Sequence, residues 1–265
     1  MKITLLVDDQ PTDKLQSEFG LAMLLEQNGD TLLFDTGQGS ALEYNLRQLK
    51  IAPAEVKRVF LSHAHYDHSG GLAFLQPELI WHGASCGGKK QYSYHAPDDI
   101  HDISMPEAAC RVFADSAKHS VSSFEKITPH FYSTGPIPRN SFEDCGGRFF
   151  ADKDCTEPDN VAEEQALLSR DGVLISGCCH SGIINTLSHC RRWHPEITVH
   201  TIVGGLHLRC ASRARLLETA DFLRKNQLKR LFLMHCTGAN AVASLQKLLP
   251  EVEITVPMPG QSWEC

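Results

Sequence analysis

The chain has 265 residues, of which 42% are hydrophobic, 22% charged and 8% aromatic. These proportions are those of an ordinary globular protein, and they exclude intrinsic disorder, collagen and coiled coil. The formal net charge of −7 at pH 7 argues against a general affinity for nucleic acid or for an anionic membrane surface. Two counts are unusual: 14 histidines and 10 cysteines.

The cysteines do not suggest a disulfide framework. Such frameworks are typical of small secreted chains that cannot build a core, and this chain is long enough to build one. No C-x-x-C pair occurs, and Met1–Val7 reaches Asp8 after only a short apolar run, unlike a signal peptide. No uncharged apolar run approaches the roughly 18 residues that a membrane helix needs. We therefore expect a cytoplasmic protein whose thiols are mostly free.

The first third of the chain predicts a hairpin followed by alternating helices and strands. Asn28-Gly29 lies between two apolar runs, Gly20–Glu26 and Asp30–Phe34, and favours a type I′ turn because both of its residues tolerate positive φ. The elements expected next are a helix through Leu42, Leu46 and Leu49, a buried strand at Arg58–Ser62, a short helix near Gly71–Leu75 and a strand at Leu79–Trp81.

Residues 83–160 differ from the rest. They are rich in Ser, His, Asp, Gly and Pro, and their hydrophobic periodicity is weak. They still carry aromatic residues, among them Phe113, Phe124 and Phe131, which a flexible linker would not need. We expect an insertion or lid built on the main fold.

After this segment the earlier pattern returns. A second hairpin is predicted around Arg170-Asp171-Gly172, and Ser212 is placed to cap a helix. The other elements expected here are a helix at Ile184–Trp193, strands at Thr198–Val203, Leu231–Met234 and Val252–Val256, and a helix at Ala239–Leu249. Because hairpin, helix, strand and helix occur twice, we expect one mixed α/β domain over residues 1–265, with two sheets and helices outside them.

The strongest chemical signal is a run of four potential metal ligands directly after the strand at Arg58–Ser62. His63 and His65 are two residues apart and project to one side of an extended segment. Asp67 and His68 follow on the turn that opens the next helix. Imidazole and carboxylate groups suit zinc, with manganese or iron as alternatives, so we expect one or two divalent ions here. Asp67 is also the candidate catalytic residue.

This H-x-H-x-D-H run, preceded by a strand ending in Phe34-Asp35-Thr36-Gly37, resembles the metallo-β-lactamase superfamily. The resemblance implies a four-layer αββα sandwich with a mononuclear or dinuclear metal site at its edge. It also implies that Asp35 is structural and forms hydrogen bonds beneath the metals instead of ligating them.

Three further histidines follow apolar strands in the second half, where the superfamily keeps its remaining ligands: His180, His207 and His235. The superfamily usually adds a bridging Asp in a Gly-Asp pair, and this chain has Gly177-Cys178 at the corresponding place. Three alternatives stay open. His207 replaces the Asp, the site has no bridge, or Cys178 is a ligand or lies beside the site.

The departures from the usual pattern resemble a narrower group, the dihydropterin–ribofuranosylaminobenzene-phosphate synthase-like metalloproteins. The resemblance spans about residues 18–240, and the segments that carry it are Glu18–Leu21, Asp35–Gly37, His63–His68, Thr134–Arg139, Gly177–Asn185, Gly204–Leu208 and His235–Gly238. It implies a small substrate that is phosphorylated or pterin-like.

These motifs are consistent with two enzymatic functions. A metal-bound hydroxide can hydrolyse a small phosphorylated, ester or lactone metabolite. Alternatively, the metals act as Lewis acids for a transferase that alkylates an aryl carbon with a pterin-methyl diphosphate and releases pyrophosphate. Arg139, Glu18 and Ser181 are the candidate substrate-binding residues, because Arg forks onto phosphate oxygens and the other two adjoin the motifs. A non-catalytic metal-binding protein and a di-iron redox protein are the alternatives of another class.

Overall fold

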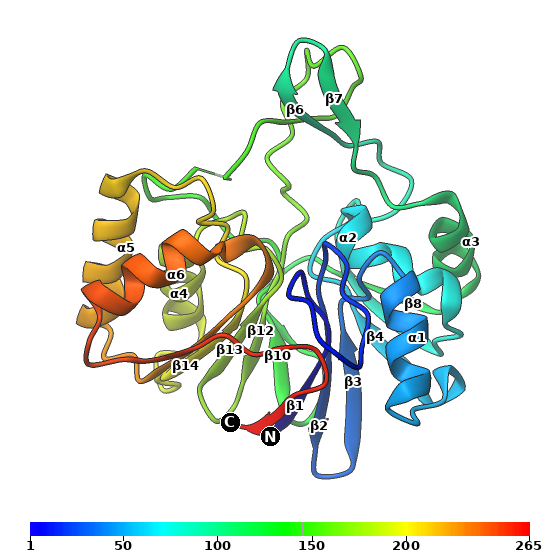
Figure 1. Cartoon of the computed structure of the whole chain (residues 1–265), viewed down its shortest axis with the longest axis horizontal. Coiled ribbons are helices and arrows are strands. Elements are labelled where there is room, and N and C mark those ends of the chain that lie inside the picture. Colours follow the sequence, from blue (N-terminus) through cyan, green and yellow to red (C-terminus); the bar gives the residue numbers. More distant parts are fainter. Residues whose placement is uncertain (145) are drawn as a thin grey trace. The chain divides into compact units, whose positions relative to one another are not determined.

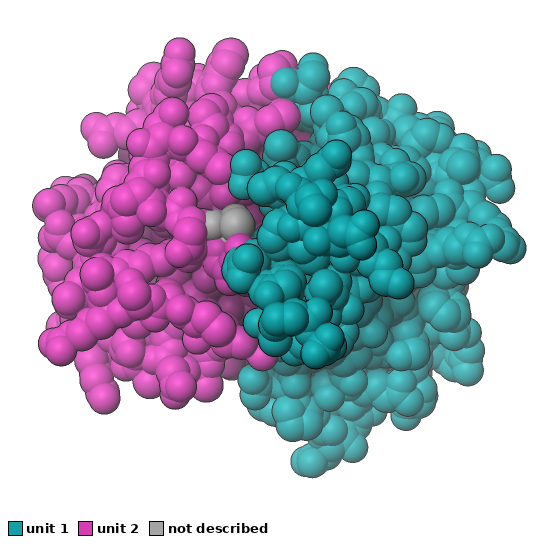
Figure 2. Space-filling model, turned by 90° about the horizontal axis from the view of Figure 1, so that it is seen from above, with its two compact units in different colours: residues 1–122, 148–163, 258–265 teal, residues 123–147, 164–257 magenta. Residues whose placement is uncertain are grey.

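Two units, each built on a seven-stranded sheet, make up the computed structural model, which describes residues 1–144 and 146–265. Unit 1 comprises residues 1–122, 148–163 and 258–265, and unit 2 comprises residues 123–147 and 164–257. Figure 2 colours the two units teal and magenta. Each has its own buried apolar cluster, so each is described separately below.

The sheet of unit 1 has the strand order β17-β1-β2-β3-β4-β5-β8. Its strands are β1 (Lys2–Val7), β2 (Ala22–Gln27), β3 (Asp30–Phe34), β4 (Arg58–Phe60), β5 (Leu79–Gly83), β8 (Lys118–Val121) and β17 (Ser262–Glu264). The hairpin predicted from Asn28-Gly29 is confirmed: β2 and β3 pair antiparallel, and both turn residues have positive φ, 51° and 86°. From β3 to β8 the strands are parallel, so β3 and β4 end at the same edge.

Helices cover one face of this sheet. They are α1 (Ser40–Gln48), α3 (Glu107–Asp115), the one-turn α2 (Tyr66–Ser69) and two 3₁₀ turns at Pro53–Glu55 and Gly70–Phe74. Leu42 of α1 and Phe113 of α3 lie in the same buried cluster as Val59 of β4. On the opposite face of the sheet, Phe34 and Phe60 stack with their ring centroids 5.5 Å apart. The apolar packing on both faces fixes the ends of β3 and β4, where the polar motif begins.

The segment 83–160 contributes to several sheets. β6 (Tyr92–Ala96), β7 (Asp99–Asp102) and β11 (Phe149–Phe150) form a separate three-stranded sheet in unit 1, and Figure 1 labels its β6–β7 hairpin. β8 extends the large sheet of unit 1, and β9 (Glu125–Lys126) and β10 (Phe131–Ser133) extend that of unit 2. Sequence periodicity gave no signal for these short strands. The role of the segment as an insertion or lid stays a prediction.

The sheet of unit 2 has the order β16-β15-β14-β13-β12-β10-β9. Its remaining strands are β12 (Leu167–Ser169), β13 (Val173–Ser176), β14 (Thr201–Gly204), β15 (Arg230–Leu233) and β16 (Glu253–Thr255). The second predicted hairpin is confirmed, with Leu167 opposite Ile175. β13, β14, β15 and β16 are parallel, and consequently the residues that follow β13, β14 and β15 leave the sheet at one edge.

Three helices pack on one side of this sheet, as Figure 1 shows: α4 (Ile183–Trp193), α5 (Arg213–Lys225) and α6 (Ala239–Leu248). Leu187, Leu223 and Leu245, one from each helix, share a buried cluster with Ile202 and Leu231 of the sheet. Ser212 caps α5 as predicted, because its side-chain oxygen accepts a hydrogen bond from the Arg215 N–H at 3.2 Å. A further 3₁₀ turn at His235–Thr237 follows β15.

Candidate metal centre

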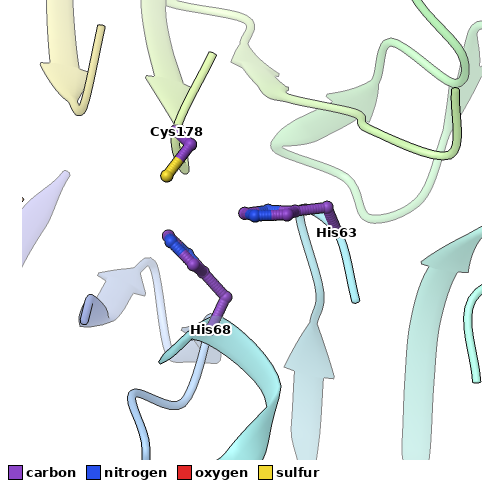
Figure 3. Close-up of side chains that lie close together, drawn as sticks. All are labelled: His63, His68 and Cys178. Carbon is purple, nitrogen blue, oxygen red and sulfur yellow. The ribbon is translucent and has the colours of Figure 1, made fainter. Parts of the chain in front are cut away.

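The H-x-H-x-D-H run lies in unit 1 between the end of β4 and α2, and we call its four ligand residues the first half-site: His63, His65, Asp67 and His68. All four are buried, with at most 5% of each residue exposed. Figure 3 shows the imidazoles of His63, from the loop after β4, and His68, from α2. The strand and the one-turn helix therefore fix both ends of a ligand segment only six residues long.

The nitrogens of this half-site converge. His63 Nε2 lies 3.0 Å from His65 Nδ1, and His68 Nε2 lies 3.7 Å from a carboxylate oxygen of Asp67. Two nitrogens bound to one tetrahedral zinc ion lie about 3.3 Å apart, given zinc–nitrogen bonds of about 2.0–2.1 Å. Burial lowers the pKa of His65 to about 4, so its imidazole is neutral at pH 7 and keeps a lone pair for a metal. The donor set thus fits a divalent ion.

Asp35 supports this half-site from the end of β3. It has a left-handed backbone, with φ of 55°. Its carboxylate accepts hydrogen bonds from the N–H and the hydroxyl of Ser62, both at 2.7 Å, and lies 2.7 Å from His68 Nδ1. Because an ionised carboxylate only accepts, His68 Nδ1 carries the proton and Nε2 keeps the lone pair. Asp35 therefore fixes the His68 tautomer that can bind a metal.

Glu18 has a structural place in this unit. Its carboxylate accepts hydrogen bonds from the backbone N–H groups at the start of α1, those of Gln38, Gly39 and Ala41, at 2.8 to 3.2 Å. Ser40 Oγ also donates to it, at 3.0 Å. These contacts satisfy N–H groups that a helix start leaves without partners. A substrate-binding role for Glu18 stays a prediction.

The second half-site lies in unit 2, in the turns after three parallel strands, and comprises Cys178 and His180 after β13, His207 after β14, and His235 and Cys236 after β15. Figure 3 includes Cys178. Each turn contains one non-glycine residue with a left-handed backbone: Cys179 with φ of 62°, His207 with 46° and His235 with 51°. Such conformations cost about 1–3 kcal/mol each and are concentrated at functional sites.

Cys178 belongs to both ligand groups found within unit 2. The ligand atoms of Cys178, His180 and His207 lie within 4.8 Å of one another, and so do those of Cys178, His235 and Cys236. Of these five residues only His207 is partly exposed; the others are buried. Gly205 leaves space for this arrangement, because a Cβ there would come within 2.4 Å of Cys236 Sγ.

Ser181 lies in the turn that carries His180, and Arg139 contacts this turn. An Arg139 N–H group donates to the backbone carbonyl of His180. The backbone N–H groups of His180 and Ser181 each donate to Glu164 at 2.6 Å. Glu164 carries no signal in the sequence that marks it as part of a site: it lies two residues before Ala166, where the apolar run that leads into β12 begins. Substrate binding by Arg139 and Ser181 stays a prediction.

No helix among the described residues is both long enough and apolar enough to cross a membrane.

Comparison with known proteins agrees with the motif. The family model of the metallo-beta-lactamase superfamily matches residues 17–107. Over 252 residues the chain is 26% identical to 7,8-dihydropterin-6-methyl-4-(beta-D-ribofuranosyl)-aminobenzene-5'-phosphate synthase of Methanocaldococcus jannaschii, covering 85% of this chain and 83% of that protein. It is 28% identical to protein MJ0448 of the same organism, covering 93% and 94%.

The crystal structure of Tm1679, described as a metal-dependent hydrolase of the beta-lactamase superfamily, is similar over 100% of this chain and 99% of that one. The TM-score is 0.87 and the identity 26%. Shorter matches to ribonuclease Z also occur, such as one of 29% identity to the Protochlamydia amoebophila enzyme that covers 38% of this chain and 37% of that protein. The mixed α/β architecture predicted from the sequence is therefore confirmed, and the chain contains a domain of the metallo-β-lactamase superfamily, with the fold of that superfamily.

Proposed function

We propose that this chain is a metal-dependent hydrolase acting on a small phosphorylated, ester or lactone metabolite, with one or two divalent ions as its cofactor. The observation that carries the proposal is the geometry of the first half-site. One nitrogen of His63 and one of His65, both in buried imidazoles, lie 3.0 Å apart. Asp67 and His68 follow in the next turn, where Asp35 supports the His68 ring. Similarity over the full chain to a structure described as a metal-dependent hydrolase supports it.

In this proposal the metal ligands of unit 1 are His63, His65, Asp67 and His68, and those of unit 2 include His180 and His235. A divalent ion bound there acts as a Lewis acid and brings the pKa of water from about 15.7 towards 7. The chain's own contribution is to keep the His65 imidazole neutral and to aim the ligand side chains, and Asp67 offers an oxygen that accepts a proton or binds the ion. Zinc suits this donor set best, with manganese and iron as alternatives.

We further propose that Cys178, and not His207, takes the place of the bridging Asp. Within unit 2 Cys178 is the member common to both ligand groups, and it is buried, whereas His207 is partly exposed. A thiolate is a softer ligand than a carboxylate and favours zinc over manganese. The metal preference of the protein therefore depends on which of these two residues binds.

A second candidate is the pterin-methyl transferase reaction, which the 26% identity to the synthase over most of the chain favours. This reaction releases pyrophosphate, and the diphosphate of its substrate is the group that Arg139 would bind. Both candidates use a small-molecule substrate. The partial matches to ribonuclease Z make tRNA the nucleic acid to include in a test.

The test is a turnover assay on the purified full-length protein, stripped with a chelator and reloaded with zinc, manganese or iron. The substrate panel contains an aryl phosphodiester, an aryl phosphomonoester, an acyl lactone and a precursor tRNA, and a coupled assay follows pyrophosphate release from a pterin-methyl diphosphate. The proposal predicts metal-dependent hydrolysis of a small substrate that His63→Ala abolishes.

Pyrophosphate release would select the transferase, and cleavage of tRNA alone would overturn the small-molecule assignment. Metal binding without turnover on any substrate would favour a non-catalytic metal-binding protein. Visible absorbance from a di-iron centre, reversibly bleached by reductant, would favour the redox alternative.

A further inference from the structure

The turn from Gly177 to Gly182, which carries His180, is held by hydrogen bonds to side chains outside the turn. Its residue Cys179 has a left-handed backbone, with φ of 62°. A non-glycine residue rarely adopts this conformation unless its surroundings enforce it. The side-chain contacts of the turn therefore determine where the His180 imidazole points.

Glu164 holds the turn on one side. Its two carboxylate oxygens accept one hydrogen bond each: Oε1 from the N–H of His180 and Oε2 from the N–H of Ser181, both at 2.6 Å. Only 2% of Glu164 is exposed. A buried carboxylate must be compensated by hydrogen bonds or opposite charge, and here the main compensation comes from two successive backbone N–H groups of the ligand turn.

Arg139 holds the same peptide from its carbonyl side. Its guanidinium donates a hydrogen bond to the His180 oxygen. The N–H of His180 is thus bonded to an acidic side chain, and its C=O is bonded to a basic one. Such a pair restrains the rotation of one residue more tightly than either contact alone.

The next residues of the chain are fixed in a similar manner. Asn185 of α4 donates from Nδ2 to the carbonyl of Ser181 at 2.7 Å, and its Oδ1 accepts from the N–H groups of Asn140 and Ser141 at 2.9 and 2.8 Å. The segment Arg139–Ser141 is therefore bonded to the turn directly at His180 and, through Asn185, at Ser181.

We infer that Glu164 and Arg139 form a clamp on the backbone of His180 that positions its imidazole as a metal ligand, so that both are positioning residues of the metal centre. This inference rests on the proposed function, in which His180 binds metal. It gives Arg139 a role that needs no contact with substrate phosphate. It also predicts that changing either residue alters metal binding without removing a ligand atom.

The chain offers a closely matched control. Glu163 precedes Glu164, and each of the two residues is 2% exposed. Glu163 accepts hydrogen bonds within unit 1, from Gln91 Nε2 at 2.9 Å and Lys89 Nζ at 3.4 Å, and neither of these donors belongs to a proposed metal ligand. Glu163→Gln and Glu164→Gln therefore make the same chemical change at adjacent buried positions.

The experiment titrates cobalt(II) into the metal-free full-length protein and records both its affinity, by competition with a chelator, and its visible d–d spectrum. In Glu164→Gln one carboxylate oxygen is replaced by an NH₂ group, which cannot accept a hydrogen bond. One of the two backbone N–H groups of the turn therefore loses its acceptor. We expect Glu164→Gln to bind cobalt about 10–100-fold more weakly than wild type, with a changed d–d spectrum. Arg139→Lys should change the spectrum in the same direction, and Glu163→Gln should match wild type in both readouts even where its thermal stability falls.

Wild-type affinity and spectrum in Glu164→Gln would overturn the inference, as would an equal change in Glu163→Gln. His180→Ala separates this failure from failure of the proposed function. If His180→Ala loses cobalt binding while Glu164→Gln keeps it, only the clamp is wrong; if His180→Ala also binds as wild type, the metal assignment of unit 2 is wrong. Should Glu164→Gln not fold, Glu164→Asp and Arg139→Lys carry the same comparison.

Discussion

The two half-sites place similar chemistry on different kinds of framework. In unit 1 the four ligand residues lie within the six residues His63–His68, which form one loop and one helical turn. In unit 2 the candidates are spread over residues 178–236 and meet because three parallel strands end at one edge of a sheet. The first half-site is therefore a property of local sequence, and the second is a property of topology.

Their supporting residues differ in the same way. The first half-site is supported by one buried carboxylate, Asp35, which bonds directly to the His68 ring at 2.7 Å. In the second, the carboxylate of Glu164 bonds to the backbone of the ligand turn, and three left-handed residues set the directions of the side chains. We conclude that a local motif needs support for its ring tautomers, whereas ligands gathered from separate strands need support for their backbone.

Removal of a ligand from the first half-site should have the largest effect, and this effect is on turnover. His65→Ala removes a ligand atom from the compact first half-site, so metal-dependent activity should fall by more than the roughly 10–100-fold that is typical of residues supporting a ligand. Steady-state kinetics with saturating zinc measure this. His101→Ala, at an exposed histidine of β7, is the control and should retain wild-type activity. Equal activity in both variants would remove the first half-site from the mechanism.

Asp35→Asn should have the next largest effect. An amide at this position can donate as well as accept, so it no longer fixes the proton on His68 Nδ1, and we expect metal affinity to fall about 10–100-fold. Competition with a chromophoric chelator measures the change. Asp30→Asn, at a carboxylate paired with Arg58 at 3.1 Å nearer the surface, is the control. An affinity equal to that of wild type would show that Asp35 only stabilises the loop.

The thiols of unit 2 give a sharper test of the second half-site. If Cys178 is a ligand, the cobalt-loaded protein should show a sulfur-to-cobalt charge-transfer band in the near ultraviolet, and Cys178→Ser should lose it. Cys179→Ser is the matched control. Burial raises the pKa of the Cys179 thiol well above its usual value, and its Sγ lies 3.7 Å from Thr186 Oγ1.

If the band is instead unchanged in Cys178→Ser, Cys178 is not a ligand. His207→Ala then tests the alternative, because removal of His207 should weaken metal binding only if this residue replaces the bridging Asp.

Glu18→Ala should have the smallest effect. Removing the carboxylate leaves several N–H groups at the start of α1 without their acceptor and should cost about 0.5–2 kcal/mol of stability. Chemical denaturation measures this cost, while metal content should stay at the wild-type level. A raised KM with unchanged stability would contradict the capping role and restore the prediction that Glu18 contacts substrate.

How much the sequence predicts depends on how local each feature is. Asn28-Gly29 predicts a hairpin because two adjacent residues determine the turn, and His63–His68 predict a ligand cluster because six residues do. By contrast β17, at Ser262–Glu264, pairs with β1 at the other end of the chain, and no local pattern announces such a strand.

The same limit applies to Glu164. Its importance follows from hydrogen bonds to residues 16 and 17 positions further along the chain, across the β12–β13 hairpin. Neither composition nor periodicity reports such contacts. The strand ends that carry His180, His207 and His235 were visible in the sequence, but the residues that orient them were not.

The most direct test of the central claim is quantitative metal analysis of the full-length protein. Wild type, His63→Ala, His235→Ala and His101→Ala are each loaded with zinc and then dialysed. If both half-sites hold metal, wild type and His101→Ala will retain one or two equivalents of zinc, and His63→Ala and His235→Ala will each lose at least one. Wild-type zinc content in both His63→Ala and His235→Ala would contradict the account.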